Sequence, residues 1–131
     1  MKIQLKFEIK PMAKQSFRTT RTGNKYLDAS VIKYRKAIRN MAIAQMRNQK
    51  AEKIEGAVNM NIIFAFRRPK SLSKKERTVP KTTKPDIDNL TKAILDALNG
   101  IAWKDDAQVT QINVHKIWSA KDQIEIEIWE T

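Results

Sequence analysis

The sequence predicts a single small α+β domain, spanning residues 1–131, in which a mixed β-sheet packs against helices. Two observations lead to this fold class. Strand-like and helix-like segments follow one another as strand, hairpin, helix, strand, short helix, helix, strand and strand, without the regular βαβ repeat of a doubly wound sheet. In addition, 131 residues are enough to bury one hydrophobic core but not two.

The first elements are a strand and a hairpin. Residues 2–10 carry apolar side chains at every second position, which is the period of a half-buried strand, and Pro11 ends the pattern. Residues 17–27 resemble a basic hairpin that turns at Thr22-Gly23-Asn24, because glycine tolerates the positive φ that tight turns need.

A long amphipathic helix is predicted next, from an N-cap at Asp28 or Ser30 to about Lys50, because this stretch lacks Gly and Pro and spaces its apolar residues by helical turns. Its outer face carries Lys33, Lys36, Arg39 and Arg47. This face is either an ordinary solvated surface or a DNA contact.

The later elements are predicted from the same periods and from turn residues. In order, they are a strand over residues 58–66, one or two capped helical turns over 71–77, a loop bracketed by Pro80 and Pro85, a helix that follows Asp86-Ile87-Asp88-Asn89 and stops at Asn99-Gly100, and two strands over about 108–118 and 123–129.

The charge is large and unevenly distributed. The formal net charge is +12, with 11 basic residues against one acid over residues 10–50 and 8 against one over residues 67–84, whereas residues 85–131 hold 9 acids and 4 bases. Lysine and arginine that neutralise phosphates release counterions, so a polyanionic partner such as a nucleic acid is indicated. A basic protein without such a partner is the alternative.

Other classes of function are excluded or disfavoured by composition. With no cysteine and one histidine, neither a disulfide framework nor a thiolate or histidine-rich zinc site can form, so a metal would need carboxylate ligands. No apolar run approaches the ~18 residues of a membrane span. We therefore expect a cytoplasmic protein with no membrane partner and no nucleotide cofactor.

Acidic residues gather at two places that would suit a metal ion. Asp86 and Asp88 point to the same side of an extended segment, and Lys92 lies one helical turn beyond Asp88. Asp105 and Asp106 precede the next strand, and neighbouring strands lie only about 5 Å apart. Three carboxylates are therefore expected to converge and to bind Mg²⁺, which prefers hard oxygen ligands.

Each of these residues also has a structural interpretation. Asp88 or Asn89 would cap the helix, Asp105 and Asp106 would be turn residues, and Lys92 would form an ion pair with Asp96. His115 is more typical of a structural or exposed strand residue than of a general base. Trp103 would pack, order the acidic turn or stack on a base, and packing is favoured.

One long pattern resembles a known family. Residues 84–100 read KPDIDNLTKAILDALNG, and residues 103–109 read WKDDAQV. The ordered combination D-x-D-N-L-x-K, a helix ending in D-A-L, and W-x-D-D-A-Q-V resembles the RusA family of Holliday junction resolvases. Residues 69–75 and the basic region after Pro11 are also similar, so the resemblance runs over most of the chain.

The resemblance implies a small α+β endonuclease that acts on four-way DNA junctions as a homodimer with Mg²⁺, in DNA recombination and repair. It assigns Asp86, Asp88 and Asp106 as metal ligands and Lys92 as the catalytic lysine, with Asn89 in a supporting role. Asp105 either supports these ligands or is itself the third one. Family members are often encoded by phages and prophages.

A homodimer with two identical sites suits two symmetric nicks. Basic residues would hold the junction arms mainly through phosphates. They are Lys14, Arg18, Arg21, Lys25, Arg67, Arg68, Lys70, Lys74, Lys75, Lys81 and Lys84. The alternatives are a non-catalytic, structure-selective DNA-binding protein of phage type and a nuclease for other branched DNA such as flaps or forks.

Overall fold

The computed structural model describes residues 2–13, 18–26, 28–72 and 79–131. Within them, β1 (Lys2–Phe7), β2 (Arg18–Thr19), β3 (Lys25–Tyr26), α1 (Ala29–Asn48), β4 (Val58–Arg67), β5 (Val79–Pro80), α2 (Ile87–Leu98), the short 3-10 helix η1 (Asp106–Gln108), β6 (Val109–Ser119) and β7 (Gln123–Glu130) follow one another. No helix in these ranges is long and apolar enough to cross a membrane.

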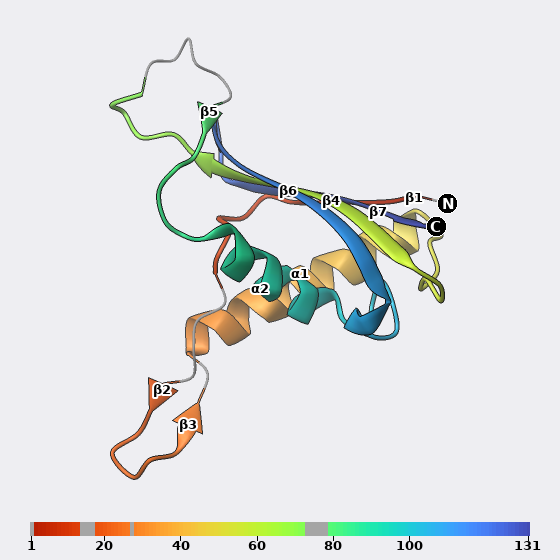
Figure 1. Ribbon diagram of the computed structural model, residues 1–131, viewed down its shortest axis with the longest axis horizontal. Coiled ribbons are helices and arrows are strands. Elements are labelled where there is room, and N and C mark those ends of the chain that lie inside the picture. Colours follow the sequence, from red (N-terminus) through yellow and green to blue (C-terminus); the bar gives the residue numbers. More distant parts are fainter. Residues whose placement is uncertain (1, 14–17, 27, 73–78) are drawn as a thin grey trace.

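The main sheet is mixed, which confirms the predicted fold class. In the described residues its strand order is β1-β7-β4-β6-β5, and only β4 and β6 pair in parallel. The antiparallel pairs are β1 with β7, β7 with β4, and β5 with β6. Figure 1 shows both α1 and α2 on one side of this sheet, while the β2–β3 hairpin extends away from it beyond the start of α1. The fold is thus a two-layer α+β arrangement.

Alternating side chains fill the space between sheet and helices. The fully buried side chains include Ile3 and Phe7 of β1, Met60, Ile62 and Phe64 of β4, Ile124 and Ile128 of β7, Ile38 of α1, and Leu90, Ile94 and Leu98 of α2. Burying one such side chain contributes about 1.5–3 kcal/mol. The packing of α2 against this layer fixes where both of its ends lie.

The two helices are also joined by charged side chains. Arg39 of α1 donates from Nη1 to the carbonyl oxygens of Ala97 and Asn99, at 3.1 and 3.2 Å, which satisfies carbonyls left open at the end of α2. Arg35 Nη2 lies 3.8 Å from Asp96 Oδ2. Arg39 therefore joins two helices rather than belonging to a solvated outer face.

Three expectations about local structure meet different outcomes. The hairpin turn is confirmed, because Gly23 has a φ of +85° between β2 and β3. Asp28 is the N-cap of α1, and its side chain accepts from Ser30 N at 2.9 Å. The helical turns predicted over residues 71–77 fall mostly outside the described residues.

Two glutamines, Gln45 in α1 and Gln49 at its C-cap, cover the open edge of β1. Gln45 accepts from Lys6 N at 2.8 Å and donates to Lys6 O at 2.7 Å. One helical turn later, Gln49 accepts from Gln4 N at 3.0 Å and donates to Gln4 O at 2.6 Å. Each amide side chain thus takes the place of a neighbouring strand. This satisfies backbone groups that would otherwise offer an edge for pairing with another chain.

Replacing both glutamines in the double variant Gln45→Met, Gln49→Met should lower the free energy of unfolding by about 1–2 kcal/mol, because the four hydrogen bonds to β1 are lost and water replaces them only in part. Denaturant titration measures this change. Asn48→Met, an exposed position on the same helix, serves as the control and should change stability by less than about 0.5 kcal/mol. An equal effect of control and double variant would contradict the assigned role.

Candidate functional site

Asp86 and Asp88 lie together at the beginning of α2. Asp86 is the N-cap residue, with φ −73° and ψ 145°, and Asp88 is exposed in the first turn. The Asp86 side chain makes no capping hydrogen bond, and its Oδ2 instead lies 2.9 Å from Lys84 Nζ. The prediction that Asp88 or Asn89 caps the helix is therefore wrong. Both carboxylates face solvent at the positive end of the helix dipole, where anions are favoured.

Lys92 and Asn89 follow on the next positions of α2. Lys92 is exposed, and no ion pair of its ammonium is found with any residue that the structure describes. The alternative of a Lys92–Asp96 pair is wrong, since Asp96 faces Arg35 of α1. Asn89 is half-buried beside the acidic pair. The ammonium of Lys92 is thus available to a ligand one turn beyond Asp88.

Asp105 and Asp106 have different surroundings at the other end of α2. Asp105 precedes η1, and its side chain accepts from Ala107 N at 3.3 Å as a helix cap. Asp106 Oδ1 accepts from the indole Nε1 of Trp103 at 2.8 Å, and Trp103 itself is fully buried. The structure thus gives Trp103 both proposed roles, packing and ordering of the acidic turn. The buried indole thus orients the Asp106 carboxylate, whereas the Asp105 carboxylate accepts a hydrogen bond from the backbone of η1.

Gln108 holds this acidic turn in place, although it was not singled out from the sequence. Its Oε1 accepts from the backbone N–H groups of Lys104 and Asp105, and its Nε2 donates to the carbonyls of Ile54 and Gly56 at 2.9 Å each. The two contacts of Oε1 close the turn itself, and the two contacts of Nε2 tie it to the segment before β4. The glutamine of the W-x-D-D-A-Q-V pattern was the available signal.

The two acidic ends do not meet within one chain. Helix α2, whose twelve residues rise by about 18 Å, runs between them. A second path agrees, because Pro85 O accepts from Lys116 Nζ while Asp106 lies just before Val109. The strand between those two points spans about 23 Å. Among the residues described, no three His, Cys, Asp or Glu side chains lie close enough to hold a metal ion.

The expectation that three carboxylates converge within one chain is therefore wrong. It assumed that both segments meet the same end of the sheet. Instead, α2 runs back along β6, so Asp86 lies at the carboxyl end of this strand and Asp106 at its amino end. The donors are hard oxygens that suit Mg²⁺, but a single chain offers only Asp86 and Asp88 at one place.

Lys81 does not fit its predicted part as a DNA contact. Its side chain is 8% exposed, and Nζ lies 4.2 Å from the ring centre of Trp118 and 5.1 Å from that of Phe66. Burial, followed by the nearby charges of Lys116 and Lys10, lowers the pKa of Lys81. An ammonium enclosed in this way is not free to meet a phosphate.

The other predicted DNA-binding residues lie on two separate segments. Arg21 and Lys25 are exposed on the hairpin that contains Arg18 in β2. Arg67 is exposed at the end of β4, Lys70 and Lys84 are exposed between β4 and α2, and Arg68 is half-buried. Lys14, Lys74 and Lys75 lie outside the described residues. In Figure 1 the hairpin and β5 lie at opposite ends of one side of the view, with the loop into α2 between them.

Comparison with known proteins places these features in a family. A family model described as Endodeoxyribonuclease RusA matches residues 7–129. The uncharacterized protein YqaN of Bacillus subtilis (strain 168) is 38% identical over 85 residues, which cover 59% of this chain and 60% of that protein. The crossover junction endodeoxyribonuclease rusA of Lactococcus phage r1t is 39% identical over 51 residues, covering 38% of this chain and 39% of the phage protein. The matched region thus spans about three fifths of the first relative's length and two fifths of the second's.

A double-mutant cycle tests the contact between Trp103 and Asp106. We expect Trp103→Phe and Asp106→Ala to show a coupling energy of about 1–2 kcal/mol in denaturant unfolding, because the hydrogen bond has a charged acceptor. The cycle of Trp103→Phe with Asp105→Ala is the matched control and should be additive. Additivity within about 0.5 kcal/mol in both cycles would show that the indole does not hold Asp106.

Proposed function

Because this chain belongs to the endodeoxyribonuclease RusA family, we propose that it is a Mg²⁺-dependent endonuclease that resolves four-way DNA junctions by paired symmetric nicks. One observation supports this most strongly. In a chain of net charge +12, Asp86 and Asp88 are exposed at the start of α2, and Asp86 is not used to cap the helix. Two neighbouring carboxylates that face solvent suit a divalent cation that also binds a phosphate.

The metal ligands in this proposal are Asp86, Asp88 and Asp106, with Asp105 supporting the turn. Since one chain holds the two acidic ends about 18 Å apart, we propose that the site is completed by a second copy. In a two-fold dimer with antiparallel α2 helices, the Asp106 end of one copy meets the Asp86 end of the other. The symmetry then generates two identical sites, as two symmetric nicks require.

The chain's own residues have distinct roles in this reaction. When bound, Mg²⁺ supplies an activated water and stabilises the negative charge that develops on the phosphate. The Lys92 ammonium, one turn from Asp88, adds positive charge where that phosphate becomes more negative. Asn89 supports the position of the acidic pair. Trp103 holds one oxygen of Asp106 and leaves the other for a ligand.

The proposed substrate follows from the two basic segments. Arg21 and Lys25 present exposed cations on the hairpin, Arg67 and Lys70 do so at and just after the end of β4, and Lys84 does so in the loop that carries Asp86. Contacts to phosphates read shape and charge more than sequence, and their affinity falls with salt. The name of the phage relative, a crossover junction endodeoxyribonuclease, supports a four-way junction as substrate.

The nuclease proposal is tested by cutting a synthetic four-way junction. We expect nicking with Mg²⁺, none with a chelator, and a loss of at least about 10³-fold in rate for Asp86→Asn or Asp88→Asn, with junction binding unchanged or tighter because a negative charge near phosphate is removed. Flap and fork DNA substrates are tested in the same assay. A parent protein that binds junctions without cutting any of them would instead indicate a non-catalytic DNA-binding protein.

The shared site is tested by mixing two inactive variants. A heterodimer of Asp86→Asn with Asp106→Asn has one site that carries both changes and one that carries neither, if each site draws on two copies. We therefore expect mixed dimers to nick one strand, although each variant alone is inactive. Sites built within one copy would each carry one change, and the mixture would then stay inactive.

Asp105→Asn is the matched control in this assay. It should keep the cap of η1, because asparagine caps helices about as well as aspartate, and it should retain cutting. Loss of cutting with Asp105→Asn, together with full activity of Asp106→Asn, would assign the third ligand to Asp105 instead.

A further inference from the structure

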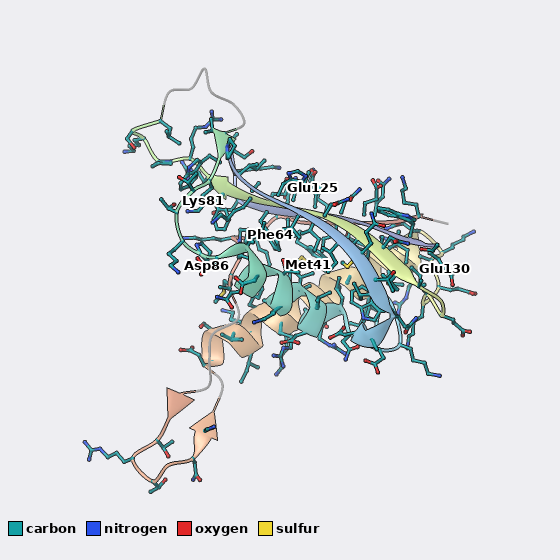
Figure 2. All side chains as sticks on the ribbon, in the orientation of Figure 1. Met41, Phe64, Lys81, Asp86, Glu125 and Glu130 are labelled. Atoms are coloured by element: carbon teal, nitrogen blue, oxygen red, sulfur yellow. The ribbon has the colours of Figure 1, made fainter. Side chains whose placement is uncertain are left out.

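The loop between β5 and α2 is held by two buried or half-buried lysines. Lys116 of β6 donates from Nζ to Thr83 O at 2.7 Å and to Pro85 O at 2.8 Å. Lys81 donates from Nζ to Lys84 O at 2.6 Å and to the Thr83 hydroxyl. Three successive carbonyls before Asp86 are thus each bonded to an ammonium. Figure 2 shows Lys81 and Asp86 at the two ends of this loop.

Both lysines stand where the fold would accept an apolar residue. Position 116 pairs with Phe64 across β4 and β6, on the face that also carries Ile112, Val114 and Trp118. Lys81 is enclosed between Trp118 and Phe66. In the described part of the chain, neither ammonium has a carboxylate partner, so ring faces, carbonyl oxygens and the Thr83 hydroxyl offset the loss of water.

The contacts of Lys81 and Lys116 hold the backbone of the loop that leads to Asp86, and the Asp86 side chain has no comparable contact of its own. The Asp86 carboxylate is not fixed by a capping bond, and its contact with Lys84 is exposed to solvent. On the helix side, the Asp86 backbone is held by Leu90 N, which donates to Asp86 O at 3.1 Å. On the loop side, the three carbonyls bonded to Lys81 and Lys116 hold it. The position of the carboxylate therefore depends on these two lysines.

We propose that Lys81 and Lys116 are positioning residues that fix the Asp86 carboxylate for the metal ion and the scissile phosphate. This inference rests on the proposed function. It differs from a DNA-binding role, because both ammonium groups are already bonded to the protein's own carbonyls. Partners that orient a metal ligand in this way typically affect metal affinity or activity by 10- to 100-fold, roughly, when they are removed.

The test compares Lys81→Met and Lys116→Met with Lys121→Met, a control that removes one exposed lysine of the β6–β7 turn. With Mn²⁺ as probe and no DNA, calorimetry should show that the affinity for Mn²⁺ is about tenfold weaker in the first two variants and unchanged in the control.

Two further measurements use the same variants. In cutting of the four-way junction, kcat should fall about 10- to 100-fold while KM changes less than about twofold. Backbone NMR at the Asp86 amide should show an order parameter falling from about 0.85 to below about 0.6.

The thermal midpoint of unfolding distinguishes a positioning role of Lys81 and Lys116 from a role in stability alone. Lys81→Met should keep or raise the thermal midpoint, because a buried charge is replaced by an apolar chain of similar size. Activity lost without a lower midpoint is the expected result. Lys116→Arg, whose guanidinium can donate to both carbonyls, should recover most of the Mn²⁺ affinity. Wild-type Mn²⁺ affinity and an unchanged Asp86 order parameter in both methionine variants would overturn the proposal.

The outcomes also separate this inference from the proposed function. A parent protein that cuts no branched DNA would refute the nuclease proposal, and the NMR measurement on the free protein would still decide whether the lysines position Asp86. Conversely, a parent that cuts and methionine variants that cut equally well would refute only the role of Lys81 and Lys116.

Discussion

Helix α2 acts as a spacer on which the arrangement of the acidic residues depends. Its apolar side holds Leu90, Ile94 and Leu98 in the core, and Arg39 bonds to the carbonyls at its end, so the helix cannot slide or tilt without losing both. Asp86 is thereby fixed at one end of β6 and Asp106 at the other. A helix of twelve residues is too long for a single ion to bridge, so Asp86 and Asp88 lie at one end and Asp106 at the other rather than in a closed cluster.

The positive charge of the chain is used in two different ways. The side chains of Arg21 and Lys70 are exposed, and the exposed Lys84–Asp86 contact is of the kind that contributes little to stability and is readily exchanged. Lys81 and Lys116 instead donate hydrogen bonds to backbone carbonyl oxygens, which stabilise the ammonium charge as a counterion would. The composition does not distinguish the exposed cations from Lys81 and Lys116. The two groups differ in how far their side chains are buried.

Polar side chains that reach the backbone recur at the edges of this fold. Gln45 and Gln49 complete the open edge of β1, and Gln108 joins the acidic turn to the segment before β4. In each case an amide supplies both a donor and an acceptor, so that a strand edge or loop needs no further strand beside it. These contacts join residues more than 38 positions apart, for example Lys6 and Gln45.

The sequence by itself determined the family and most of the elements, although β5 was expected to be part of a loop. Alternation in residues 2–10, 58–66 and 123–129 and helical spacing in α1 and α2 each report which face of an element is buried, because that period is a local property of the backbone. The ordered pattern from Asp86 to Val109 pointed to the RusA family, which the match over residues 7–129 confirms. The choice of ligands among its aspartates stays a prediction.

Only the tertiary structure decided how these elements run relative to one another. Local periods do not say that α2 returns along β6, and this direction separates Asp86 from Asp106. Nor do they show that Lys81 turns inward, because a lysine is expected to keep its ammonium in water unless distant residues enclose it. Trp118 and Phe66 do so here from β6 and β4, and contacts between such distant positions arise only when the whole chain has folded.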